Sequence, residues 1–216
     1  METQAWDPFE HITNGQRQQL NAFAEMLCRF NDRVNLISPD TERDVRTHHL
    51  LHCLTLTHRG FPDDSTVVDW GTGGGLPALP LAICFPEVTV VGVDSVGKKG
   101  RAVRTMARRL GLDNCYAWTG RAEEWEGEAH YSVSRATAPL ATLWQWHRRV
   151  AVPLDEAPAD DEWPQGLLTL KGGDLRDEIE ALEAADPDAR VERDSLQLLL
   201  GRNGFFGEKE LLAVRA

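Results

Sequence analysis

Apolar residues near the amino terminus recur every three or four positions, which predicts a helix over residues 14–34. The apolar stripe consists of Leu20, Phe23, Ala24, Leu27, Phe30 and Val34. Ser38 and Pro39 then match a helix cap followed by a first-turn proline, so we expect a second helix from there to about Thr57. A helical leader therefore precedes the remainder of the chain.

Beyond residue 65, short β-branched apolar runs alternate with segments of helical period. The runs predict strands at 66–70, 88–94, 114–118, 130–134 and 166–171, with helices at 77–84, 97–111, 140–149 and 174–184. Two further strands, at 190–199 and 209–215, are separated by a glycine-containing turn and predict an antiparallel edge hairpin. Repeated strand–helix units favour a parallel sheet with helices on both faces.

The expected fold is therefore α/β, with a Rossmann-like, seven-stranded, mostly parallel sheet and an N-terminal helical extension. We place the extension at residues 1–62 and the sheet-containing domain at 63–216. Residues 151–164 are rich in Pro, Asp and Glu, and we expect them to form a mobile surface loop.

A glycine-dense turn follows the first predicted strand. Residues 69–76 read D-W-G-T-G-G-G-L, and the next strand ends in Asp94. A dinucleotide-binding loop would carry glycine where Leu76 stands, whereas a methyltransferase loop has an acid before its glycines, as Asp69 is here. S-adenosylmethionine has an ammonium group that this acid could attract and no phosphate to repel, and Asp94 could accept both ribose hydroxyls. We therefore expect Asp69, Gly73 and Asp94 to bind this cofactor.

The formal net charge of −11 at first argues against a nucleic-acid partner. Its distribution changes that expectation, because residues 98–150 hold 10 Lys and Arg against 5 Asp and Glu. Six basic residues lie on one predicted helix: Lys98, Lys99, Arg101, Arg104, Arg108 and Arg109. Positions 103, 106, 107 and 110 are apolar and would face the sheet. A basic helix in so acidic a chain favours RNA contact, with a merely solvated face as the alternative.

Further charged residues follow the third, fourth and fifth predicted strands, at the sheet edge where such folds bind ligands. Arg121 and Glu123 follow the third strand, Arg135 the fourth, and Lys171 ends the fifth. We expect some of these residues to bind phosphates or the target base. The candidates for RNA binding are Lys98, Arg101, Arg121 and Lys171.

The sequence gives little support for a metal site, a membrane span or secretion. The cysteines at 28, 53, 84 and 115 form neither a CxxC pair nor a zinc-ligand spacing. His48 and His52 are one helical turn apart, but no acid or cysteine is spaced to complete a metal site. No apolar run could span a membrane, and residues 1–10 lack a secretory signal. We therefore expect a cytoplasmic protein without a metal or a membrane partner.

Several motifs, in order, resemble the RsmG family, also called GidB. Residues 30–38 resemble its leader block W-N-x-x-x-N-L-T-S, and residues 69–80 are close to its D-V-G-T-G-x-G-L-P-G-I-P loop. The motifs D-S-V-G-K-K, R-A-E-E, S-R-A and L-K-G follow at 94–99, 121–124, 134–136 and 170–172. The loop together with D-S-x-G-K-K is specific, because generic methyltransferases lack it. The chain departs from the family at His52 and His130, where acids are usual, and at Trp70, where a small aliphatic residue is usual.

The resemblance implies a class I S-adenosylmethionine-dependent methyltransferase that modifies N7 of one guanosine in the decoding-region loop of 16S rRNA. It also implies cofactor contacts from Gly71, Leu76, Ala122, Glu123 and Arg135. Guanine N7 carries an unprotonated lone pair that can attack the sulfonium methyl group without a general base, so we assign no catalytic residue. The expected partner of this monomer is 16S rRNA or a small-subunit particle.

Two other functions remain open from the sequence. The net acidity would suit a methyltransferase that acts on a small metabolite. A non-catalytic nucleotide-binding or assembly protein is the third possibility, and it would work normally without Asp69.

Overall fold

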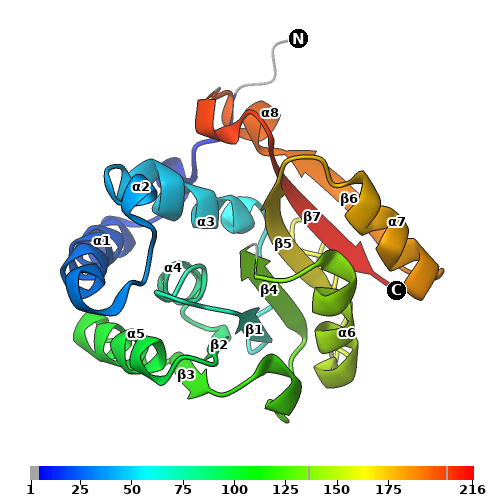
Figure 1. The fold of residues 1–216 in the computed structure, drawn as a ribbon, viewed down its shortest axis with the longest axis horizontal. Helices are drawn as coiled ribbons and strands as arrows, with labels where there is room; N and C mark the ends of the chain where they lie inside the picture. Colours follow the sequence, from blue (N-terminus) through cyan, green and yellow to red (C-terminus); the bar gives the residue numbers. More distant parts are fainter. Residues whose placement is uncertain (1–4, 136, 203) are drawn as a thin grey trace.

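The computed structural model describes residues 5–135, 137–202 and 204–216 (Figure 1). Within these residues, a seven-stranded sheet has the order β3-β2-β1-β4-β5-β7-β6. Its strands are β1 (Thr66–Trp70), β2 (Thr89–Asp94), β3 (Cys115–Thr119), β4 (Tyr131–Arg135), β5 (Leu167–Gly172), β6 (Arg190–Ser195) and β7 (Lys209–Arg215). The first five are parallel, and β7 is antiparallel to both β5 and β6. The predicted parallel sheet with an antiparallel edge is confirmed.

Helices cover both faces of this sheet. The helices α4 (Ala78–Cys84) and α5 (Gly97–Leu110) lie on one face, and α6 (Leu140–Val150) and α7 (Arg176–Ala185) lie on the other (Figure 1). Alternation along each strand divides the core accordingly. Val67 belongs to the core beneath α4 and α5, whereas Val68 belongs to the core beneath α6 and α7.

The predicted strand at 190–199 is wrong in its second half. β6 ends at Ser195, and α8 (Leu196–Leu200) follows directly. The Ser195 hydroxyl accepts a hydrogen bond from the Leu198 amide, so this residue caps the new helix. Leu196 and Leu200 are buried one turn apart, and Gly201 ends the helix with φ of 58°. A short leucine-rich run fits either a strand or a helix, and the cap decides between them.

The leader contains the predicted first helix but not an unbroken second one. α1 spans Asn14–Val34 and begins with a capping box between Thr13 and Gln16. The next segment is divided into α2 (Pro39–Glu42), the π-helical η2 (Arg46–Leu51), α3 (His52–Leu54) and the 3-10 helix η3 (Thr55–His58). Three further short 3-10 helices among the described residues are η1 (Pro8–Glu10) in the leader and, beyond it, η4 (Ala122–Glu124) and η5 (Gly204–Phe206).

Side chains of the leader explain the interruption of its second helix. The Asp44 carboxylate accepts from the Thr47 amide, which begins a new turn there. The Thr55 and Thr57 hydroxyls donate to carbonyls three residues earlier, at His52 and Leu54. Such side-chain hydrogen bonds compete with the α-helical pattern of the backbone.

The leader and the sheet share one hydrophobic core. Phe23 and Leu27 of α1 belong to the same buried cluster as Leu79 of α4 and Val103 of α5. The proposed division at residues 62 and 63 therefore separates two segments that pack as one body. Among the described residues, no helix is both long and apolar enough to cross a membrane.

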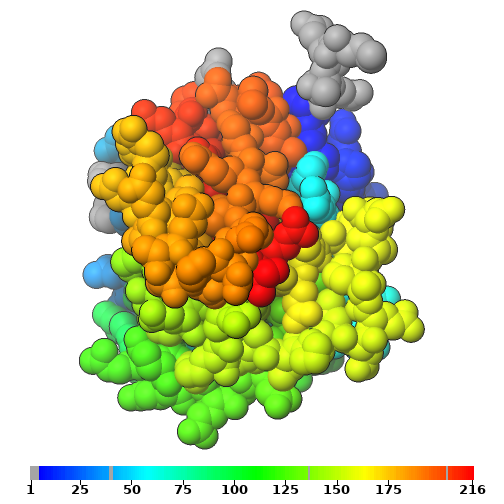
Figure 2. Space-filling model, turned by 90° about the vertical axis from the view of Figure 1, so that its right-hand side faces the viewer, coloured from blue at the N-terminus to red at the C-terminus, as the bar shows by residue number. Residues whose placement is uncertain are grey.

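The loop at 151–164 runs over the surface, where Figure 2 shows it in yellow beside the red end of β7. Its end is firmly anchored. Trp163 is buried, and its indole N–H donates to the Leu56 carbonyl at 2.8 Å. The Tyr131 hydroxyl donates to the Trp163 carbonyl at 2.8 Å. The Pro- and Glu-rich segment is thus tied to the leader and to β4.

Candidate functional site

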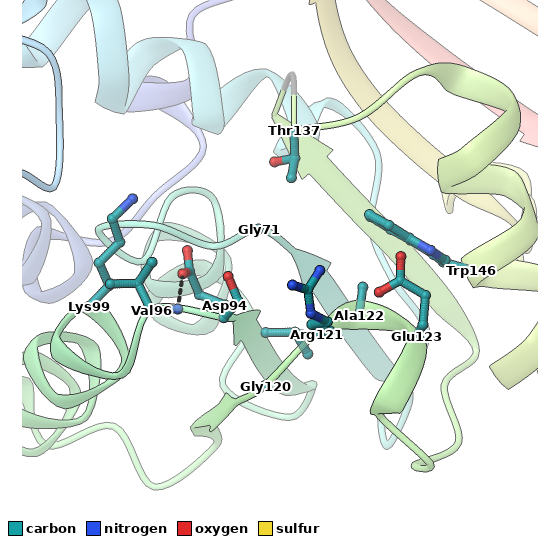
Figure 3. A pocket seen from close by; sticks show the side chains of 12 residues that line it. Gly71, Asp94, Val96, Lys99, Gly120, Arg121, Ala122, Glu123, Thr137 and Trp146 are labelled. Atoms are coloured by element: carbon teal, nitrogen blue, oxygen red, sulfur yellow. Dashed lines mark hydrogen bonds between the residues drawn. The ribbon is translucent and has the colours of Figure 1, made fainter.

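A cavity of about 420 Å³ opens at the carboxyl ends of β1, β2 and β3 (Figure 3). We call it the sheet-edge cavity. Figure 3 shows Asp94 and Lys99 on one side and Glu123 and Trp146 on the other, with Arg121 between them. The carboxyl edge of the parallel strands is where the topology of such sheets places ligands.

The glycine loop after β1 forms one wall of the cavity. Gly71 has φ of 72°, and a Cβ atom there would lie 2.2 Å from Cγ2 of Thr137. The Gly71 amide donates to the Val93 carbonyl at 2.8 Å, which ties the loop to β2. Only glycine fits this conformation and this close approach.

Asp94 is held rigidly at the end of β2. Its Oδ1 accepts from the Val96 amide at 2.8 Å, and its Oδ2 accepts from the Gly73 amide at 3.0 Å. Each oxygen keeps a further lone pair for a ligand. The side chain is only 9% exposed, so the ligand that fills the cavity would meet a fixed carboxylate.

Asp69 lies at the same edge, but it does not line the cavity. It is 0% exposed, and its Oδ2 accepts from the Ala78 amide at 3.1 Å. Burial raises the pKa of Asp69 to about 7, although the hydrogen bond from the Ala78 amide opposes the rise. Neither Asp69 Oδ1 nor Thr72 Oγ1 completes a hydrogen bond among the described residues.

The turn after β3 forms the opposite wall. Arg121, Ala122 and Glu123, which the sequence singles out, all line the cavity. Arg149 of α6 supports the turn, because its guanidinium donates to the carbonyls of Ala122 and Trp125. The sequence gives no sign of this support, since α6 reaches the turn only in the folded chain.

Three other candidate residues do not line the cavity. Gly73 contributes its amide to Asp94, and Leu76 is buried beneath the loop. Arg135 points to the leader, where its Nη1 donates to His49 Nδ1 at 2.7 Å and to the His48 carbonyl at 3.3 Å. Ala136, which belongs to the same motif, lies outside the described residues.

His49 is well suited to accept this hydrogen bond from Arg135. Burial and the nearby Arg135 charge lower the pKa of His49 to about 3, so the ring is neutral at physiological pH. Its other nitrogen, Nε2, can then donate to the Thr41 hydroxyl, which lies 2.8 Å away. Arg135 therefore joins β4 to the leader.

The basic helix is exposed as predicted. Lys98, Arg101, Arg104 and Arg108 of α5 are exposed, and the apolar residues of this helix are buried against the sheet. Lys99 alone of its basic residues lines the sheet-edge cavity among the described residues. The cationic face thus begins beside the cavity and leads away from it.

Lys171 does not belong to that open surface. It is only 6% exposed, and its Nζ donates to Glu178 Oε2 at 2.6 Å and to the Ala138 carbonyl at 2.9 Å. The sequence marks this lysine but not its partner, because Glu178 comes from α7.

Sequence reasoning missed Trp146 and Thr137, which also line the cavity. Trp146 belongs to α6, and its ring centroid lies 5.9 Å from that of the buried Trp70. Nothing in the local sequence distinguishes Trp146 from a core tryptophan.

The two histidines that depart from the family pattern have structural contacts. His52 packs edge-on against Phe205, with 5.5 Å between ring centroids. His130 Nδ1 accepts from the Thr66 amide at 2.9 Å, a role that a carboxylate can also fill. Across the described ranges, no group of three or more His, Cys, Asp or Glu residues is placed to hold a metal ion.

Solved structures support the fold. A "SAM dependent methyltransferase from Aquifex aeolicus" matches with a TM-score of 0.55 and 15% identity, over 80% of this chain and 94% of that one. A ribosomal protein L11 methylase from Lactobacillus delbrueckii subsp. bulgaricus matches with a TM-score of 0.52 and 17% identity, over 76% of each chain. These likenesses confirm the class I methyltransferase fold.

Sequence comparison shows the family. The family described as "GidB: rRNA small subunit methyltransferase G" matches residues 16–199. The protein named "Ribosomal RNA small subunit methyltransferase G" in Salinibacter ruber is 74% identical over all 216 residues of this chain and 100% of its own. A protein of the same name in Porphyromonas gingivalis is 37% identical over 172 residues, 79% of this chain and 76% of its own. The chain therefore belongs to the rRNA small subunit methyltransferase G (GidB) family.

Proposed function

We propose that this protein transfers the methyl group of S-adenosyl-L-methionine to N7 of one guanosine in the decoding-region loop of 16S rRNA. The class I fold and the family support methylation of small-subunit rRNA with this cofactor. They favour rRNA over the small-metabolite and non-catalytic alternatives. The single observation that carries the cofactor half is the sheet-edge cavity with the fixed Asp94 carboxylate.

The residues of the cavity fit S-adenosylmethionine. Its volume of about 420 Å³ lies within the roughly 300–1,000 Å³ typical of ligand pockets. Asp94 offers lone pairs to the ribose hydroxyls, and Ala122 and Trp146 offer apolar surface to the adenine ring. The buried Asp69, when ionised, would supply a negative charge near the glycine loop, suited to the methionine ammonium, and its Oδ1 has no hydrogen-bond partner among the described residues.

We propose two roles for the candidate residues. Gly71, Asp94, Ala122 and Glu123 line the cavity and would contact the cofactor directly. Gly73 and Leu76 would act by shaping its walls, and the charges of Asp69 and Arg135 would act on the cofactor from behind them.

Methyl transfer to guanine N7 would require the protein mainly to position the cofactor and the base. The cofactor supplies a methyl group made electrophilic by its attachment to a sulfonium. Guanine N7 has a free lone pair at neutral pH, so no side chain needs to remove a proton first. The protein would instead align N7 with the methyl group and keep water away, which can lower the barrier substantially.

RNA would approach over the exposed face of α5. Lys98 and Arg101 offer positive charges to phosphates close to Arg121 and Lys99 at the rim of the cavity. Because the rest of the chain is acidic, this local face would orient the RNA rather than attract it from afar.

The test is chemical cleavage of rRNA at 7-methylguanosine. Small-subunit rRNA from a strain lacking the gene, treated with borohydride and aniline, should lose one primer-extension stop in the decoding-region loop. The wild-type gene should restore the stop, Asp94→Ala should not, and the exposed-site control Glu126→Ala should restore it. A stop that persists in the deletion strain would contradict the proposal.

A further inference from the structure

A second cavity lies beside the sheet-edge cavity, at the carboxyl end of β5. It measures about 360 Å³ and is lined by Thr137, Ala138, Pro139, Lys171, Gly172 and Glu178. We call it the β5 cavity. Thr137 lines both cavities, so the two are neighbours.

The strand order places the ends of β1 and β5, which border the two cavities, close together. β4 lies between β1 and β5, with Trp70 opposite Ser134 and Arg135 opposite Leu170. Neighbouring strands are about 4.8 Å apart, so the ends of β1 and β5 are separated by about 10 Å. A flat ring in the β5 cavity could therefore present one edge to a methyl group in the sheet-edge cavity.

The charged side chains that line the β5 cavity are a buried lysine and a carboxylate in contact. Two of the three N–H groups of Lys171 are occupied, by Glu178 Oε2 and by the Ala138 carbonyl. Glu178 Oε2 also accepts from the Leu140 amide at 2.8 Å, at the start of α6. No described residue donates to Glu178 Oε1, and the Glu178 side chain is 34% exposed.

This pair matches one edge of guanine. The Watson–Crick edge of guanine carries an acceptor, O6, next to two donors, N1–H and the N2 amine. The third N–H of Lys171 can donate to O6. Oε1 of Glu178, the carboxylate oxygen that the Lys171 and Leu140 contacts leave open, can accept from N1–H and the N2 amine. Guanine N7 lies on the other side of O6, on the Hoogsteen edge, and stays free.

We infer that the β5 cavity binds the target guanine, with Lys171 and Glu178 reading its Watson–Crick edge so that N7 faces the sheet-edge cavity. This inference rests on the proposed function and adds the residues that select the base. It also requires the guanine to be unpaired, as is usual for bases that proteins read in RNA loops.

Inosine tests the inference without any mutation, because it lacks only the N2 amine. We would measure transfer of a radiolabelled methyl group to small-subunit rRNA, ligated so that the target position holds guanosine or inosine. The wild-type protein should methylate inosine about 10- to 100-fold less efficiently in kcat/KM, since the site would leave an acceptor unpaired. Equal efficiency on the two bases would overturn the inference.

The variant Glu178→Gln then tests whether this residue is responsible for the preference for guanosine over inosine. Its amide oxygen can still accept from Leu140 and Lys171, but its amide N–H groups would meet the guanine donors. We expect kcat/KM on guanosine to fall about 100-fold, the guanosine-to-inosine ratio to approach 1, and S-adenosylhomocysteine affinity to stay within about threefold. Glu180→Gln, on the same helix and exposed, should leave all three values unchanged.

The outcomes separate this inference from the proposed function. A wild-type protein that never methylates guanosine N7 contradicts the function itself. If it methylates guanosine N7 while Glu178→Gln keeps the wild-type base ratio, the function stands, and the Lys171–Glu178 pair only holds the segment before α6.

Discussion

Asp94 presents a carboxylate whose orientation is set by two backbone amides rather than by a ligand. Removing it deletes a charged acceptor and also frees the Gly73 amide. We expect Asp94→Ala to lower S-adenosylhomocysteine affinity by about 10- to 100-fold, or about 1.5–3 kcal/mol. Isothermal titration calorimetry measures this loss. Glu126→Ala, an exposed acid outside the cavity, is the control and should bind normally.

The protonation state of Asp69 should make cofactor binding depend on pH. Its pKa of about 7 means that the carboxyl is partly protonated near neutrality. Ionisation would favour the ammonium of the cofactor, so we expect S-adenosylhomocysteine affinity to rise between pH 6 and pH 8. Calorimetry in buffers of different ionisation enthalpy should show proton release on binding at pH 7. An unchanged pH dependence in Asp69→Asn would count against this role.

Asp69 also makes the free energy of unfolding depend on pH, but this quantity should fall as pH rises, whereas cofactor affinity should increase. The pKa of Asp69 lies above its ordinary value of 3.8 in the folded chain, so the folded chain holds a proton that the unfolded chain releases. The contribution of Asp69 to the free energy of unfolding therefore falls as pH rises from about 4 to about 7. Asp69→Asn should remove this fall, as urea unfolding at several pH values would show.

At the scale of elements, the two sides of α5 differ in character. Its apolar side is buried against the sheet, and its basic side is exposed. We expect Arg101→Glu combined with Arg108→Glu to weaken RNA binding. The slope of log affinity against log salt should fall by about one for each phosphate that the variant no longer neutralises. Filter binding over a salt series measures this slope.

The control for α5 is Arg190→Glu, which changes an exposed residue on the edge strand β6. It alters net charge by the same amount per residue but lies on another element. A slope reduced equally by this control would show that net charge matters and that the α5 face does not. S-adenosylhomocysteine affinity should be unaffected in every one of these variants.

For the whole molecule, the shared core predicts that leader and sheet unfold together. Leu27 of α1 is completely buried, and its truncation leaves a cavity between the leader and the α4–α5 layer. We expect Leu27→Ala to reduce the free energy of unfolding by about 2–5 kcal/mol. Tryptophan fluorescence reports mainly on the sheet, because six of the seven tryptophans lie beyond residue 62. If the leader folded alone, the fluorescence midpoint would not move.

The elements that the sequence determined are those with strong local patterns. The strands around Asp69 and Asp94 and the amphipathic helix α5 follow from periodicity, because side chains alternate across a strand and recur every 3.6 residues on a helix. The glycine loop is also local, since the backbone at Gly71 needs a positive φ. The predicted strand at 190–199 was wrong beyond Ser195, because the Ser195 side chain caps a helix that begins there.

Only the tertiary structure decided which side chains meet at the site. It buried Asp69 beneath the loop, turned Arg135 toward His49, and brought Trp146 to the cavity wall. It also paired Lys171 with Glu178 from a different helix. Such contacts depend on how layers pack across many residues of intervening chain, and no local pattern encodes them. The sequence thus determined which strand ends carry the candidate residues, and packing determined which of them line the cavity.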